Sequence, residues 1–235
     1  MTNTWQNVTQ HDTLSLTKAA RLKFRLPIEG APMQNSPEYP VVTSQTLSLD
    51  DLQPAHHYKN CTLTYSNTDV RLSELILDHC VLQQTNFRQG EWLDCQVSHC
   101  QFPNADFSGS HVYRCQFEAC QLIGTDWTMS RLKQVTFTDS QASYCNFSET
   151  ELDQCHFVST RLEEAAFQAM TVRNSLTFTD CQLVAADFSD SALKRVDFRT
   201  STIDDLRFTP ALVRGCRIDA VQALPFALAL GVEID

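Results

Sequence analysis

The sequence predicts an all-β solenoid built from square coils, each made of four five-residue sides. Apolar residues stand at every fifth position from Leu72 to Val172 and, after a slip of one residue, from Phe178 to Ile218. None of these thirty positions is polar, although only 43% of the chain is hydrophobic. A period of five fits neither an α-helix nor a flat strand. The chain must therefore turn a corner every five residues, and four such units close one coil of a repeat fold.

A second pattern describes the interior of the coil. The residue two places before each apolar centre is Cys, Ala, Ser, Thr, Gly or Val in 26 of the thirty repeats. Each side of the square therefore points one large and one small side chain inward. Residues one coil apart should stack, and the longest expected aromatic ladder is Phe87, Phe107, Trp127, Phe147, Phe167, Phe188 and Phe208. A second ladder runs from Leu77 to Ile218. An interior filled in this way leaves no room for a ligand.

The repeats set the expected boundaries. We expect a β-helix of about seven coils over residues 71–218. Residues 1–70 lack the period of five and hold five of the eight prolines, so we expect a non-repeat region there. It would serve as a cap on the open sheet edge or as a targeting segment. Tyr58 and Leu63 are candidates for an imperfect first coil. The slip within residues 173–177 should bulge one corner without ending the helix.

Five-residue units such as Ala105–Gly109, Cys145–Glu149 and Ala186–Asp190 resemble the unit of the pentapeptide-repeat family, A-(D/N)-L-x-x. The resemblance covers residues 71–218. It implies a right-handed quadrilateral β-helix. Function is a separate question, because sites are added to folds.

Residues 219–235 are expected to form a short C-terminal α-helix followed by a strand. Asp219 can cap the start of the helix with Gln222 in the capping-box position, and Gly231 can end it. Four apolar side chains exceed what an end cap needs and predict a homodimer interface. They are Leu224, Phe226, Leu228 and Leu230. The segment also resembles the dimer-forming C-terminal helix of topoisomerase-protecting pentapeptide proteins. The alternative is that it only caps the last coil.

Composition restricts the compartment and the partners. The net charge is −10 and the pI about 5.1, which argues against direct binding of nucleic acid. We find neither an apolar run long enough to span a membrane nor a signal-peptide pattern, so we expect a cytoplasmic protein. Nine of the ten cysteines occupy the small inward position, and Cys61 precedes Leu63 by the same offset. Because free cysteine behaves as a small apolar residue, we expect reduced, buried thiols.

Motifs for chemistry are missing from the sequence. It has no zinc, nucleotide or dinucleotide signature, so we predict no catalytic, cofactor-binding or metal-binding residue and no enzyme activity. His79 and His99 are one coil apart and should stack on one corner. Two imidazoles alone are too weak a signal to predict a metal site.

The outer surface is more informative. Five carboxylates beside the Phe87 ladder are expected to lie along one edge, which we call the acidic ridge. They are Asp106, Asp126, Glu149, Asp187 and Asp190. One interpretation is mimicry of a DNA backbone that binds a protein partner. The other is that Asp and Asn before each centre satisfy hydrogen bonds at the corners, as turn residues do.

The resemblance extends to Qnr-type quinolone-resistance proteins. It implies a non-enzymatic protein that binds a type II topoisomerase, DNA gyrase or topoisomerase IV, and modulates or protects it. Two features depart from that branch: the chain lacks projecting loops between coils, and its N-terminal region is longer. The alternative is an interaction scaffold or a secreted bacterial effector unrelated to topoisomerases.

Overall fold

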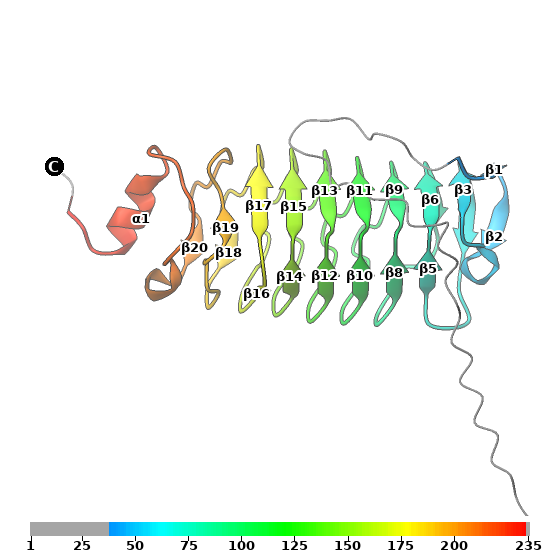
Figure 1. Ribbon diagram of the computed structural model, residues 1–235, viewed down its shortest axis with the longest axis horizontal. Helices are drawn as coiled ribbons and strands as arrows, with labels where there is room; N and C mark the ends of the chain where they lie inside the picture. Colours follow the sequence, from blue (N-terminus) through cyan, green and yellow to red (C-terminus); the bar gives the residue numbers. More distant parts are fainter. Residues whose placement is uncertain (1–37, 234–235) are drawn as a thin grey trace, which may run out of the picture. The chain divides into compact units, whose positions relative to one another are not determined.

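The computed structural model describes residues 38–233, in which parallel strands stack into four sheets around one apolar interior (Figure 1). The right-handed quadrilateral β-helix expected from the sequence is confirmed, with about eight turns. The longest sheet has nine strands: β1 (Val41–Thr43), β3 (His56–Lys59), β6 (Leu75–Asp78), β9 (Gln96–Ser98), β11 (Gln116–Glu118), β13 (Thr136–Thr138), β15 (Cys155–Val158), β17 (Leu176–Thr179) and β19 (Val196–Asp197).

The other three sheets cover further sides of the square coil. The six-stranded sheet contains β5 (Arg71–Ser73), β8 (Glu91–Leu93), β10 (His111–Tyr113), β12 (Arg131–Lys133), β14 (Glu151–Asp153) and β16 (Thr171–Val172). The three-stranded sheet contains β2 (Thr46–Ser48), β4 (Thr62–Thr64) and β7 (Val81–Leu82). The two-stranded sheet contains β18 (Asp187–Phe188) and β20 (Arg207–Phe208). Isolated parallel bridges continue the shorter sides.

The register confirms that four five-residue sides close each regular coil. Phe117 pairs with Val97 below and Phe137 above, at equal steps along the sequence. At the slip, Leu152 still pairs with Val172 at this regular step, but Phe157 pairs with Phe178, one residue further on than the regular step. The extra residue is therefore absorbed at one corner and the ladder continues, as expected.

The start of the β-helix differs from the sequence-based expectation. Val41 pairs with His57, and His57 pairs with Ile76, so both of these first steps are shorter than the regular step of the later coils. Residues 41–70 are therefore part of the β-helix, with Tyr58 and Leu63 in its core, and the expected boundary at residue 70 is wrong. A search for a period of five misses these coils because they are shorter. Residues 1–37 lie outside the described part of the chain, so a cap or targeting role for them stays a prediction.

The corners hold a conformation that the repeat pattern did not indicate. The residue two places after an apolar centre usually has a positive φ, as in His79 (53°), Tyr144 (62°) and Glu149 (57°). This left-handed region suits glycine, and Gly109 and Gly124 adopt it at equivalent corners. The other residues are held there by the ladder bonds of the neighbouring coils. For example, Glu149 donates its backbone N–H to the carbonyl of Gln168 at 2.8 Å.

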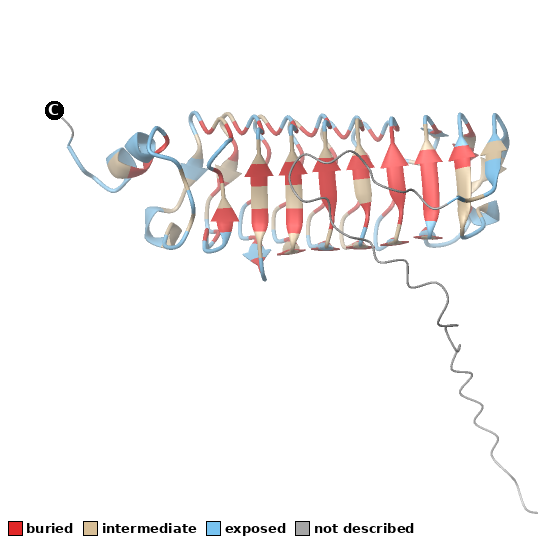
Figure 2. Ribbon diagram, turned by 45° about the horizontal axis from the view of Figure 1, so that its top comes forward, coloured by how far each residue is buried: buried red, intermediate tan, exposed pale blue. Residues whose placement is uncertain are grey.

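Aromatic ladders fill the interior, and Figure 2 shows buried residues along the stacked strands. Parallel rings follow one another from Phe87 to Phe188, with centroid distances between 4.1 and 5.9 Å. A second stack runs from Phe117 to Phe198, and rings of the two stacks meet edge to face, as Phe147 does with Phe157 at 5.5 Å. Both arrangements are favoured aromatic geometries.

The cysteines line the same interior. All ten are free, nine are buried, and Cys216 is partly exposed. Burial raises the pKa of Cys145 and Cys155 to about 12, so these thiols stay protonated at neutral pH. They act as small core residues, as the repeat pattern indicated.

The C-terminal segment continues past the 3₁₀ turn η2 (Pro210–Leu212) to the helix α1 (Ala223–Ala229). The carboxylate of Asp219 accepts hydrogen bonds from the N–H groups of Val221 and Gln222, and the Gln222 amide oxygen accepts one from the Asp219 N–H. These reciprocal bonds form as expected for a capping box, but they close a turn ahead of the helix. Helix α1 begins only at Ala223, and its N-cap residue, Gln222, makes no side-chain cap bond, so the expected cap at Asp219 is wrong.

The helix ends as expected but no strand follows within the described residues. Gly231 has a φ of 80°, and the Val232 N–H donates to the Ala227 carbonyl at 3.0 Å, which is a Schellman ending. Val232 and Glu233 then form no strand, so that part of the expectation is wrong for them. No strand of the last coil lies beside them to supply ladder bonds.

Candidate interaction surfaces

Three of the five ridge residues lie in one ladder. Asp106 bridges to Asp126, Asp126 to Asn146, Asn146 to Ala166, and Ala166 to Asp187. Each of the three carboxylates accepts a hydrogen bond at 2.9 Å from the backbone N–H two residues later. One oxygen of each carboxylate therefore accepts a backbone N–H at the corner of its own coil. The second oxygen remains available to other groups.

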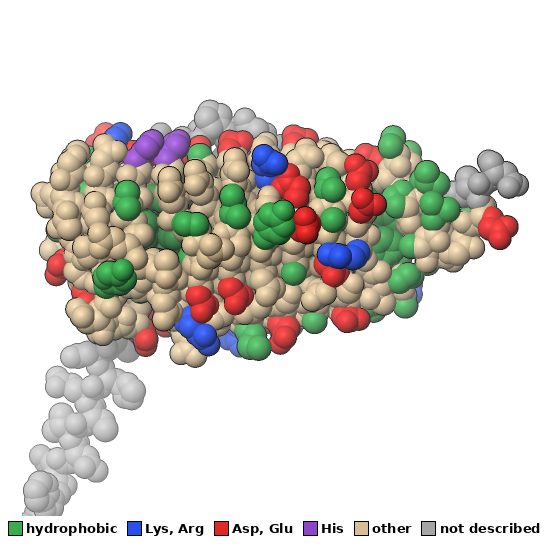
Figure 3. Space-filling view, turned by 180° about the vertical axis from the view of Figure 1, so that it is seen from behind, with side chains coloured by type: hydrophobic (Ala, Val, Ile, Leu, Met, Phe, Trp, Pro, Cys, Tyr) green, Lys and Arg blue, Asp and Glu red, His purple; other side chains and the backbone are tan. Residues whose placement is uncertain are grey.

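Glu149 and Asp190 lie in a neighbouring row, because they follow their centres rather than precede them. Both are exposed and have positive φ. Met129 stands one coil before Glu149 in that row, and Ala169 one coil after it. The acidic ridge is therefore two interrupted rows. On the face shown in Figure 3, acidic side chains are scattered among uncharged and hydrophobic ones.

Ion pairs reduce the charge at both ends of the ridge. Arg88 lies 3.5 Å from Asp106, and Arg207 lies 3.5 Å from Asp187. Burial opposes the ionisation of Asp187, but hydrogen bonds from Ser189 and Gln168 outweigh it and hold the pKa of that carboxyl below its usual range. Because of these ion pairs, a partner would meet a weaker field than five free carboxylates give.

Helix α1 presents three of the four residues expected at a dimer interface. Leu224, Leu228 and Leu230 are 50%, 56% and 57% exposed. Phe226 is not available, because it is 5% exposed and stacks on Phe208 with ring centroids 4.5 Å apart. The expectation for Phe226 is therefore wrong: its place on the inner face of a short helix makes it part of the cap on the last coil.

The side chain of Gln222 anchors this cap. Its amide nitrogen donates to the carbonyls of Phe198 and Ser201 at 2.8 and 2.6 Å. These carbonyls belong to the last regular coils, next to the final bridge of the ladder, Asp197 to Arg217. The segment thus supplies hydrogen-bond donors near the open end of the β-helix, and Leu224 and Leu228 stay exposed on the side of the helix away from Phe226.

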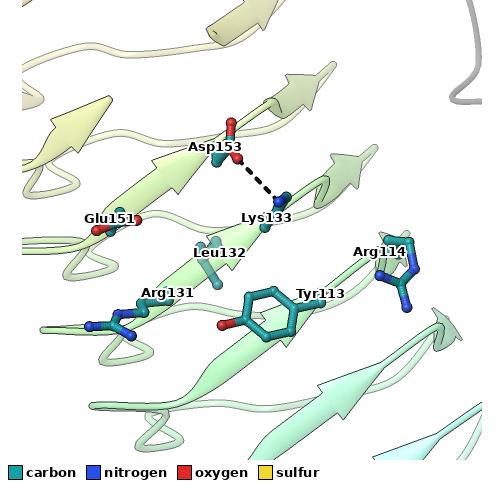
Figure 4. Close-up of a pocket in the computed structure, with 7 residues that line it drawn as sticks. All are labelled: Tyr113, Arg114, Arg131, Leu132, Lys133, Glu151 and Asp153. Carbon is teal, nitrogen blue, oxygen red and sulfur yellow. Dashed lines mark ion pairs between the residues drawn. The ribbon is translucent and has the colours of Figure 1, made fainter. Parts of the chain in front are cut away.

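An open depression crosses β10, β12 and β14, lined by Tyr113, Arg114, Arg131, Leu132, Lys133, Glu151 and Asp153 (Figure 4). Its charges are largely paired. Lys133 lies 3.8 Å from Asp153, Arg114 donates to Asp94 at 2.6 and 2.8 Å, and Glu151 accepts from Arg173 at 2.8 Å. These pairs neutralise most of the charge that lines this depression.

The corner of His79 and His99 forms as expected, with ring centroids 4.2 Å apart and an interplanar angle of 12°. Sequence reasoning missed the third member, Asp78, whose carboxylate lies 2.6 Å from His79 Nδ1. Burial opposes its ionisation, but hydrogen bonds from His79, Lys59 and Ser98 hold the pKa of Asp78 below its usual range. The available signal was the Asp–His pair, followed one coil later by Ser98 and His99.

Comparison with known proteins agrees with this geometry. Residues 110–176 match the family model described as pentapeptide repeat region. Together with the square coil and its constant register, this match identifies residues 110–176 as pentapeptide repeats. No curated protein matches the sequence. None of the helices in the described part of the chain has the length and apolar character needed to cross a membrane.

Solved structures resemble the chain at low identity. Full-length QnrB1, a plasmid-mediated fluoroquinolone resistance protein, is similar with a TM-score of 0.55 and 18% identity, over 82% of this chain and 100% of that one. A trypsin-treated variant of QnrB1 gives a TM-score of 0.52 and 20% identity, over 83% and 99% of the two chains. The likeness is one of fold.

Proposed function

We propose that this chain is a non-enzymatic cytoplasmic protein that binds a type II topoisomerase, DNA gyrase or topoisomerase IV, where that enzyme grips DNA. Binding there modulates the enzyme or protects it from quinolones. The observation that carries the proposal is the fold similarity to QnrB1 along the full length of that resistance protein. A filled β-helix offers only its outer surface for function, and the acidic ridge is the part of that surface suited to a basic partner.

The ridge acts as a partial mimic of DNA. About eight turns at about 4.8 Å per turn give a length of roughly 38 Å. Duplex DNA of that length carries about 22 phosphate charges, at one per roughly 1.7 Å. Five carboxylates cannot match this number. We therefore expect the ridge to steer and orient the partner, with shape supplying the remainder of the affinity.

A homodimer through the outer side of α1 would improve the match in length. Leu224 and Leu228, one helical turn apart, are exposed on that side, and Leu230 is exposed just past the end of the helix. Contact through a two-fold axis is the commonest way to cover such a patch. The two β-helices would then lie tail to tail and present two ridges to one extended partner surface.

A second candidate is an interaction scaffold unrelated to topoisomerases, including a secreted effector. It is favoured by the interruption of the ridge at Asn146 and Ala166 and by the hydrogen bonds between its carboxylates and their own corners. It is also favoured by the equal steps between Leu72 and Val172, which leave no inserted loop in that part of the β-helix.

A gyrase supercoiling assay, with and without a fluoroquinolone, separates the two candidates. The test variant replaces Asp106, Asp126 and Asp187 with Asn, which keeps the corner acceptor and removes the charge. The matched control replaces the exposed Asp139, Asp180 and Asp205 with Asn, away from the ridge. We expect the wild type and the control to modulate the reaction and the ridge variant to lose the effect. If the wild type leaves gyrase unaffected at micromolar concentration, the scaffold function replaces the proposal.

A further inference from the structure

The corner of Asp78, His79 and His99 brings three metal-binding side chains together on adjacent coils. Asp78 ends β6, His79 follows it, and His99 follows β9 one coil later. The two histidines have φ values of 53° and 54°, so the same corner conformation projects both imidazoles from the same edge. Figure 3 shows histidine side chains side by side at the surface. Stacking at 4.2 Å holds the two rings in a common orientation.

The donor atoms converge on one side of the Asp78 carboxylate. His79 Nδ1 lies 2.6 Å and His99 Nδ1 lies 3.6 Å from the same oxygen, Oδ1, and one donor atom from each of the three side chains lies within 4.8 Å of the others. Zinc binds imidazole nitrogen and carboxylate oxygen at about 2.0–2.2 Å, which places tetrahedral ligand atoms roughly 3.4 Å apart. The observed spacing therefore needs only small side-chain movements to admit an ion.

Other groups also hold both oxygens of the carboxylate. Lys59 Nζ lies 3.2 Å from Asp78 Oδ2, and Ser98 Oγ donates to Oδ1 at 3.1 Å. His57 Nε2 is buried without a hydrogen-bond partner and lies 3.9 Å from Oδ2. These neighbours orient the carboxylate as outer-shell groups do at metal sites. The Lys59 ammonium also opposes a second positive charge nearby, so it should weaken binding.

We infer that Asp78, His79 and His99 bind one divalent transition-metal ion of the zinc or cobalt class. Two imidazoles and a carboxylate suit these ions better than calcium or magnesium, which prefer oxygen ligands alone. The imidazole side chains are 52% and 48% exposed, so water or a ligand from another molecule can complete the coordination. An ion held there would join two neighbouring coils near the first turns of the β-helix.

Titration of the full-length protein with Co²⁺ tests this inference, because the visible spectrum of the bound ion reports its ligands. We expect saturation at one ion per chain, without the charge-transfer band of a thiolate ligand. His79→Ala and His99→Ala should each lower the affinity about tenfold or more. His111→Ala, which alters a histidine on β10, is the matched control and should leave the affinity unchanged. Lys59→Met should raise it, because it removes the competing positive charge.

Three outcomes would overturn the inference: no saturable binding by the wild type, wild-type affinity in both histidine variants, or a thiolate band. Circular dichroism of each variant checks that it is folded. Asp78→Asn gives a second, conservative test, since it keeps the shape of the corner and removes the anionic ligand. It should weaken Co²⁺ binding while the protein stays folded, whereas unchanged binding would exclude Asp78 as a ligand.

Discussion

The indole N–H of Trp127 donates to the hydroxyl oxygen of Thr125 at 2.8 Å, inside the closed coil. Thr125 fills the small inward position two residues before the large one, so the repeat itself supplies the partner. Trp92 occupies an equivalent large position, but Gly90 precedes it, and its buried Nε1 has no partner. The small position thus decides whether the coil can hold a tryptophan with its N–H satisfied.

Thr125→Val should lower the free energy of unfolding by about 1–3 kcal/mol, because it leaves the Trp127 N–H buried and unpaired. Urea denaturation followed by tryptophan fluorescence measures this change. Thr128→Val makes the same chemical change at a corner and should stay within about 0.5 kcal/mol of the wild type. Equal effects of the two substitutions would show that the Thr125 hydroxyl is unimportant.

Phe147→Ala should cost about 3–5 kcal/mol, since Phe147 is fully buried and stacks between Trp127 and Phe167. Phe147→Leu keeps more of the volume and should cost less. Equilibrium denaturation of both variants provides the comparison. A cost below about 1 kcal/mol for the alanine variant would contradict the stacked interior.

Alkaline pH should destabilise the protein. Burial raises the pKa of Cys145 and Cys155 to about 12 from a reference value of 9.0, whereas the unfolded thiols ionise near 9. Their contribution is therefore complete below pH 9 and is lost as the pH rises toward 12. The loss approaches roughly 1.4 kcal/mol per pH unit for each thiol. Urea midpoints across this range should fall less steeply for a Cys145→Ala, Cys155→Ala variant, and identical slopes would refute the link to these thiols.

The oligomeric state should depend on the outer side of α1. Leu224→Glu combined with Leu228→Glu should give a monomer at concentrations where the wild type is a dimer, as measured by sedimentation equilibrium. Val81→Glu changes another exposed apolar residue, 60% exposed, and should leave the dimer intact. Phe226→Ala should instead loosen the cap on Phe208. A wild type that sediments as a monomer at micromolar concentration would remove the interface.

The regular part of the fold was predictable because every coil from Leu72 onward repeats the same pair of inward positions. The first coils were not, since the short steps from Val41 to His57 and from His57 to Ile76 break the period, although Tyr58 and Leu63 are buried in the same way. The positive φ of a corner residue such as Tyr144 is imposed by the neighbouring coils, and the residue type does not indicate this conformation.

The candidate sites were predictable only as rows of residues. Spacing placed Asp106 and Asp126 in one ladder, but it did not reveal that each carboxylate accepts a bond from its own corner. The inward position of Phe226 depends on the ring of Phe208 beneath it, which helix periodicity over so short a segment does not specify. The orientation of Asp78 toward two imidazoles likewise depends on contacts across coils.

The constant step between coils has a mechanical consequence. Each coil bonds only to the coils directly below and above it, so tension applied to the two ends should unwind the β-helix one coil at a time. A released coil adds roughly 70 Å of extended chain, at about 3.5 Å per residue. A force–extension trace should show evenly spaced peaks for the regular coils, one slightly longer interval at the extra residue between Phe157 and Phe178, and shorter intervals for the two first coils. The spacing between force peaks would then measure the sequence period as a length of extended chain.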